Sequence, residues 1–110
     1  MSLDIALNEA WFGGGATVFE ANITHNLTKM AAEAGIYEIV WYPEEAGIKK
    51  AGKLIEPLEA AIEVMKEDPE RFKAFNHENG WGTYDGFVQW LERYLEACKE
   101  NPKARISAHR

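Results

Sequence analysis

Hydrophobic and polar residues alternate at the start of the chain and follow helical spacing through most of the rest. Leu3, Ile5 and Leu7 alternate with polar or small residues, which predicts a short strand buried on one face. β-Branched and aromatic residues at positions 17–21 predict a second strand, paired antiparallel with the first. The three glycines at positions 13–15 lie between these segments and predict a hairpin loop.

A first helix is expected to begin near Thr24 and to end at Gly35, since glycine readily takes the left-handed conformation that stops a helix. Either Asn22 or Thr24 can serve as its N-cap. Residues 36–42 fit a helical turn or a strand. We favour a helical turn that ends before Pro43, because a proline disfavours the α conformation of the residue that precedes it.

The middle of the chain is predicted to hold a connector followed by two helices. Residues 44–53 form the connector, and a helix with a clear apolar stripe starts at residues 54–56. Asp68 and Pro69 break this helix, and Asp68 can cap a short helix after it.

The strongest helical pattern covers residues 84–100, with Thr83 as its cap. Residues 105–108 can add a third strand beside the hairpin. The prediction is therefore an α+β fold, in which a small three-stranded antiparallel sheet, made of the N-terminal hairpin and a C-terminal strand, packs on three to four helices. At 110 residues the chain is expected to form one domain, 1–110.

Charge and cysteine content narrow the classes of partner and compartment. The net charge of −6 and the scattered basic residues disfavour nucleic acid and anionic membranes as partners. No leader pattern and no apolar stretch of about 18 residues is visible, so a cytoplasmic location is expected. The one cysteine, Cys98, falls on the apolar face of its helix and predicts a buried, unreactive thiol.

The segment from Asn22 to Asn26 is the most polar junction of the chain. Asn22, Thr24, His25 and Asn26 place four hydrogen-bonding side chains where a strand gives way to a helix. His25 is the best candidate for a catalytic acid or base, because imidazole titrates near neutral pH. The alternative is a heavily capped structural turn in which the same groups bond to the backbone.

Metal and nucleophile chemistry have little support in the sequence. His25 and His77 with Glu78 or Asp85 could form a two-histidine, one-carboxylate site, but no pair has metal-ligand spacing, so no metal and no cofactor are expected. A nucleophilic serine motif is also absent from the sequence.

Aromatic residues near glycine or proline offer a second group of candidates. They belong to none of the clean apolar stripes, and loop aromatics on a rigid scaffold often bind ligands: Trp11, Phe12, Trp41, Tyr42, Trp81 and Tyr84. Gly80 and Gly82 flank Trp81 and leave its indole open to close approach. The alternative is a small aromatic cluster that covers the core beneath the loops.

Two motifs, Ala-Asn-Ile-Thr-His-Asn-Leu at residues 21–27 and Asn-Gly-Trp-Gly-x-Tyr at residues 79–84, resemble those of a small family of compact bacterial and phage-encoded proteins. The similarity extends over about residues 4–107. It implies an accessory or mobile-element context for the protein. It assigns no activity and no catalytic residue.

Three functions remain open from the sequence. The first is a non-catalytic binding module for a small molecule or a partner-protein segment, with Asn22, Thr24, His25, Asn26, Trp41, Trp81 and Tyr84 as the binding residues. The second is an interaction protein that forms a homo-oligomer through its aromatics. The third is a small hydrolase or lyase with His25 as general base and a carboxylate, Glu38 or Asp85, beside it.

Overall fold

Three antiparallel strands form the sheet of this α+β fold, in the order β2-β1-β3. They are β1 (Ser2–Asn8), β2 (Thr17–Thr24) and β3 (Arg105–His109). The computed structural model describes residues 2–9 and 15–110. The predicted fold class is confirmed, whereas Trp11, Phe12 and most of the predicted glycine loop lie outside the described residues.

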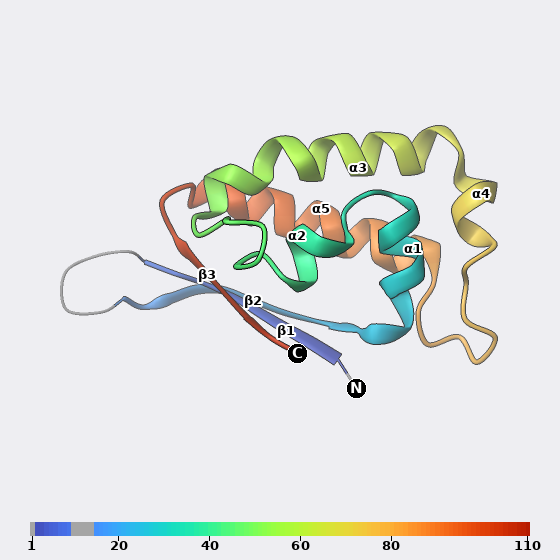
Figure 1. The fold of residues 1–110 in the computed structure, drawn as a ribbon, viewed down its shortest axis with the longest axis horizontal. Coiled ribbons are helices and arrows are strands. Elements are labelled where there is room, and N and C mark those ends of the chain that lie inside the picture. The colour runs from blue at the N-terminus through green and yellow to red at the C-terminus, as the bar shows by residue number, and fades with distance from the viewer. Residues whose placement is uncertain (1, 10–14) are drawn as a thin grey trace.

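Alternation in β1 decides which face of the sheet is covered. Leu3, Ile5 and Leu7 are buried, and the antiparallel register sets Leu3 opposite Ile23 and Leu7 opposite Ile106. The helices lie on one side of the sheet, with α3 farthest from it (Figure 1). The pleat therefore directs the polar residues of β1 to the uncovered face.

The described residues form five α-helices and two short 3-10 helices, where the sequence predicted three or four helices. In chain order they are η1 (His25–Leu27), α1 (Thr28–Glu33), α2 (Tyr37–Trp41), η2 (Ala51–Leu54), α3 (Ile55–Glu67), α4 (Pro69–Lys73) and α5 (Tyr84–Glu100). The additional elements are one-turn segments, which leave little periodicity in a sequence.

The junction between β2 and η1 differs from the prediction. β2 continues to Thr24, so Asn22 is a strand residue opposite Asp4 and the prediction that it could be an N-cap was wrong. Thr24 is the cap, because its side chain accepts the backbone N–H of Asn26. Gly35 has a φ of 75°, the left-handed stop that was predicted.

The two ends of the described chain lie side by side on the sheet (Figure 1). Asp4 of β1 is paired with His109 of β3, so His109 belongs to the strand. Arg110 then crosses to α2, where its Nη1 donates to the carbonyl of Trp41 at 2.9 Å and to Glu44 Oε1 at 2.6 Å. Its guanidinium also lies over the ring of Tyr42, 4.3 Å from the centroid.

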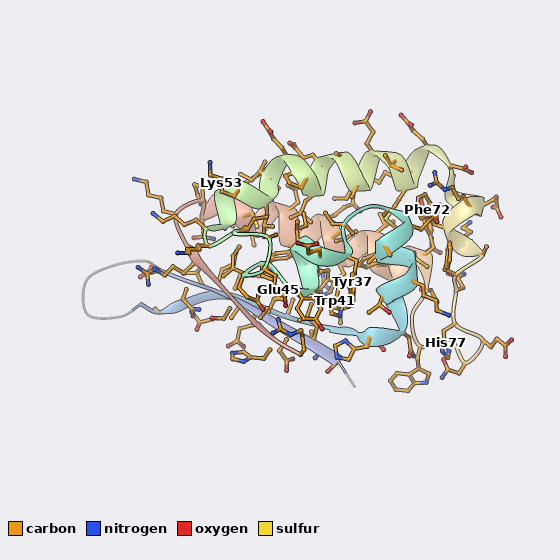
Figure 2. The ribbon with its side chains drawn as sticks, in the orientation of Figure 1. Tyr37, Trp41, Glu45, Lys53, Phe72 and His77 are labelled. Atoms are coloured by element: carbon orange, nitrogen blue, oxygen red, sulfur yellow. The ribbon has the colours of Figure 1, made fainter. Side chains whose placement is uncertain are left out.

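These contacts fix the end of α2 against the sheet. A hydrogen bond from its own backbone N–H, with a second from Arg110, holds the pKa of Glu44 below its ordinary value. Figure 2 shows Tyr37 and Trp41, the first and last residues of α2, beside each other, and their ring centroids are 5.6 Å apart. Among the described residues, no helix has the length and apolar character needed to cross a membrane.

Cys98 is buried in α5, as the sequence predicted, and burial raises the pKa of its thiol to about 12. Since the thiolate is the nucleophile, we expect iodoacetamide at pH 8 to modify the folded protein at least about a hundredfold more slowly than the urea-unfolded chain. Mass spectrometry of timed samples measures both rates. Equal rates in the two states would contradict this burial.

Candidate functional site

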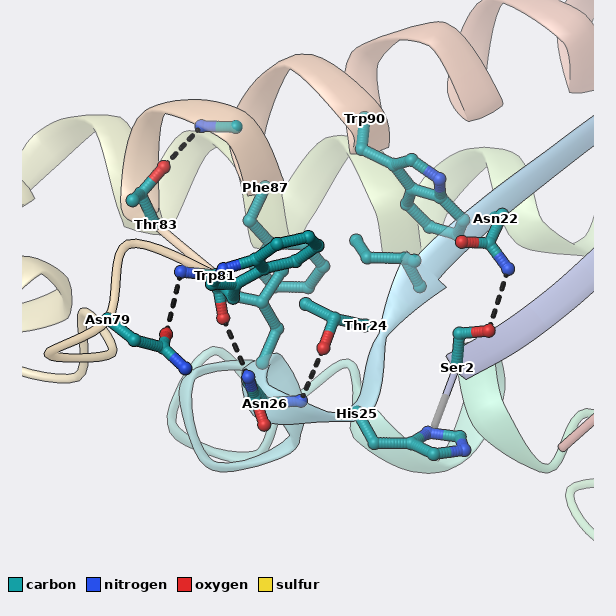
Figure 3. A pocket seen from close by; sticks show the side chains of 14 residues that line it. Ser2, Asn22, Thr24, His25, Asn26, Asn79, Trp81, Thr83, Phe87 and Trp90 are labelled. Carbon is teal, nitrogen blue, oxygen red and sulfur yellow. Dashed lines mark hydrogen bonds between the residues drawn. The ribbon is translucent and has the colours of Figure 1, made fainter.

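A pocket of about 790 Å³ lies where β2 ends and α5 begins. Its lining comes from the start of β1, from residues 22–27, from residues 79–83 and from the first turns of α5 (Figure 3). We call residues 22–27 the corner and residues 76–83 the Trp81 loop. The volume falls in the range of about 300–1,000 Å³ that small-molecule sites occupy.

The corner is held by hydrogen bonds within its own turn and across to β1. Thr24 Oγ1 accepts the backbone N–H of Asn26 at 3.1 Å, which caps η1. Asn22 Nδ2 donates to Ser2 Oγ at 2.9 Å and to Asp4 Oδ1 at 2.6 Å, which ties the β2 edge to β1. The polar junction is therefore both a capped structural turn and part of a pocket wall.

His25 is oriented by an indole. The Nε1–H of Trp41 donates to His25 Nδ1 at 2.9 Å, and Trp41 itself is 1% exposed. Because Nδ1 is the acceptor, the proton of the neutral ring is on Nε2. Among the described residues, no carboxylate bonds to His25, and neither Glu38 nor Asp85 lines the pocket.

The Trp81 loop is closed by its own hydrogen bonds. The backbone N–H of His77 donates to the carbonyl of Gly82, and that of Gly80 donates to the carbonyl of His77, both at 3.0 Å. Asn79 Oδ1 accepts the backbone N–H of Trp81 at 2.8 Å. Asn76 Oδ1 accepts the N–H of Tyr84 at 2.7 Å and joins the loop to α5.

One hydrogen bond joins the loop to the corner across 55 positions of sequence. Asn26 Nδ2 donates to the carbonyl of Trp81 at 2.8 Å (Figure 3). Gly82 makes the close approach possible, because a Cβ built there would lie 3.2 Å from Asn26 Cβ and 3.3 Å from Leu27 Cγ. Its φ of 120° is also one that residues with a side chain rarely adopt.

The backbone of Trp81 is thus fixed on both sides while its indole is 71% exposed. Phe87 and Trp90 of α5 supply aromatic surface to the same pocket. No Asp, Glu, Lys or Arg occurs among the described residues that line it, although charged residues make up 27% of the sequence. The pocket therefore combines aromatic walls with neutral hydrogen-bonding groups.

The structure brings Asn22, Thr24, His25, Asn26 and Trp81 to one concave surface, but not the other two predicted binding residues. Trp41 and Tyr84 were expected to be accessible loop aromatics, and this expectation was wrong. Trp41 packs in the core behind His25. Tyr84 is 7% exposed, and its hydroxyl donates to the carbonyl of Met65 at 2.8 Å.

Nine of the lining residues were absent from the sequence-based set, among them Asn79, Thr83, Phe87 and Trp90. Phe87 and Trp90 belong to the apolar stripe of α5, which periodicity assigns to the core. The sequence holds one signal for the others, since Asn79 and Thr83 flank Trp81 as small polar residues in a glycine-containing loop.

A second hollow of about 650 Å³ also borders η1. His25, His77 and Glu78 all line it, which corresponds to one of the metal sites considered from the sequence. Within residues 2–9 and 15–110, however, no three His, Cys, Asp or Glu side chains are grouped closely enough to hold a metal ion. His77 Nδ1 lies 2.9 Å from Asn79 Oδ1 instead.

Alanine substitutions at the two loop glycines separate backbone strain from contact with the corner. Gly80 has a φ of 78° and open space at its Cβ position, so Gly80→Ala should lower the free energy of unfolding by about 1 kcal/mol. In Gly82→Ala the new methyl group would also press against Asn26 and Leu27. We therefore expect this variant to lose about 2 kcal/mol or more of unfolding free energy. Urea unfolding measures both. Equal losses would contradict the close approach of loop and corner.

Comparison with family models, with curated proteins and with solved structures found no match. The family resemblance of the two motifs therefore stays a prediction. The functional argument rests on the geometry of the pocket.

Proposed function

We propose that this protein is a non-catalytic binding module that holds a small molecule in the pocket between the corner and the Trp81 loop. The observation that carries the proposal is an indole that is 71% exposed on a backbone bound from both sides. An exposed tryptophan side chain leaves apolar surface in water. A ligand that covers this surface gains the free energy of removing it from water.

Preorganisation adds support. The backbone hydrogen bonds of Trp81 are present before any ligand arrives, so little ordering of the chain opposes binding. The neutral polar groups around the indole can orient a ligand. The rings of Phe87 and Trp90 can shield part of the bound ligand from water. This arrangement is typical of a binding site with a few polar groups among apolar walls.

The hydrolase or lyase hypothesis has less support. A general base of this kind needs a partner that stabilises the imidazolium, and the partner of His25 is the neutral indole of Trp41. Glu38 and Asp85, the carboxylates considered for this role, are both exposed to solvent. Among the described lining residues, no acid stands beside the imidazole to complete the pair.

The interaction-protein hypothesis also has less support from the described part of the chain. Trp81 and Val64 are its two exposed large hydrophobic residues, too few for the contiguous apolar patch that a homo-oligomer interface needs. A homo-oligomer, a partner-protein segment as ligand and an accessory role in a mobile element stay predictions.

Truncation of Trp81 tests the proposal. A thermal-shift screen with sugars, nucleosides, amino acids and divalent metals should yield a compound that raises the melting temperature by several degrees at saturation. The same compound should not stabilise Trp81→Ala, because the variant keeps the fold but loses the stacking surface.

Val64→Ala is the matched control. It removes the other exposed large hydrophobic side chain, which lies on α3 and does not line the pocket. It should respond to the compound as the unaltered protein does. A compound that stabilises Trp81→Ala equally well would contradict the proposed site, and so would a screen in which nothing binds.

A further inference from the structure

Two buried polar side-chain atoms of the described chain have no hydrogen-bond partner, and one of them belongs to a pocket residue. They are Nε1 of Trp90 and the hydroxyl oxygen of Tyr94. Trp90 is 3% exposed and lines the pocket, whereas Tyr94 does not. Buried donors are nearly always satisfied, so an orphaned indole N–H beside a pocket indicates an acceptor that the ligand supplies.

The indole N–H can only donate, which restricts what it binds. The ligand must therefore carry an acceptor oxygen or nitrogen that reaches Trp90 while another part of it covers Trp81. The Trp90 nitrogen is covered in the ligand-free protein. A ligand oxygen that reaches this nitrogen must therefore displace a neighbouring side chain.

The remaining polar groups of the lining are neutral, and they include both hydrogen-bond donors and hydrogen-bond acceptors. Asn26 and Asn22 use their Nδ2 groups within the protein, which leaves each Oδ1 to accept a hydrogen bond. Thr24 and Thr83 accept backbone N–H groups, which leaves each hydroxyl hydrogen to donate. A charged ligand would find no opposite charge among the described lining residues.

We propose, building on the proposed function, that the ligand is an uncharged carbohydrate ring. Its C–H face lies on the indole of Trp81, and one of its oxygens accepts the N–H of Trp90. The negative face of an aromatic ring attracts the slightly positive hydrogens of such a sugar face. Each sugar hydroxyl both donates and accepts, which matches the mixed amides and hydroxyls of the wall.

A nucleobase is the main competing ligand, because any base can stack on an indole. Its polar groups lie in one plane at its edge. The polar groups of this pocket instead come from three separate segments, the start of β1, the corner and the Trp81 loop, and they surround the exposed indole (Figure 3). Hydroxyls directed around a saturated ring fit that distribution better.

The test uses ¹⁵N-labelled protein and the indole N–H resonances of its tryptophans, assigned with single Trp→Phe variants. The probes are methyl β-glucopyranoside, methyl β-galactopyranoside, N-acetylglucosamine, cellobiose and maltose. Glucuronic acid and glucosamine are the charged counterparts, and adenosine and uridine are the heteroaromatic ones. At least one neutral sugar should shift the resonances of Trp81 and Trp90, with a Kd below about 10 mM. The resonance of Trp41, which is bonded to His25, should not move.

Trp90→Phe and Tyr94→Phe form a matched pair of variants. Trp90→Phe removes the indole N–H and should weaken sugar binding by about threefold to tenfold. Tyr94→Phe removes the other unpartnered polar atom on the same helix and should leave binding unchanged. If Trp90→Phe fails to fold, the Trp90 resonance of the unaltered protein still decides whether its N–H meets the ligand.

The outcomes separate the two proposals. A nucleoside or a charged compound that binds in a Trp81-dependent manner, with no response to the neutral sugars, overturns the carbohydrate inference and leaves the binding module intact. A sugar that shifts Trp81 but not Trp90 overturns the role given to the Trp90 N–H. A panel in which no compound shifts Trp81 overturns the carbohydrate inference, and the binding module is overturned with it only if the wider thermal-shift screen also yields no ligand.

Discussion

The hydrogen bond from Asn26 Nδ2 to the carbonyl of Trp81 is the contact on which the pocket depends. It joins a turn that follows the N-terminal hairpin to a loop that precedes the last helix, and neither segment could form the concave surface alone. The contact is possible because Gly82 lacks a side chain where the two backbones meet. With that contact, the backbone that carries the Trp81 indole has a fixed position at the pocket rim.

The corner is in turn attached to the core. His25 receives the indole N–H of Trp41, and the carbonyl of Trp41 receives the guanidinium of Arg110. This chain of contacts runs from the pocket wall through a buried ring to the residue that follows β3. Nδ1 of His25 already accepts a hydrogen bond from Trp41, which gives the histidine a structural role. This role fits a residue in the wall of a binding site better than a catalytic residue that transfers protons.

Periodic patterns predicted the fold well, and they predicted the pocket in part. The alternation in β1 and the spacing in α5 fix the buried faces, and Thr24, Thr83 and Gly35 end or cap their elements as expected. The aromatic residues were harder to place, because proximity to glycine or proline does not say which way a ring points. Trp41 turned inward with α2, whereas Trp90 reached the pocket from a stripe that looked purely like core.

The central claim is that Asn26 holds the Trp81 loop in place, and ¹⁵N relaxation tests it most directly. Asn26→Asp keeps the shape of the side chain but replaces the donor with an acceptor. The backbone order parameters of residues 79–82 should be near the rigid value of about 0.85 in the unaltered protein and fall below about 0.6 in the variant. Order parameters that are equal in the two proteins would contradict the account.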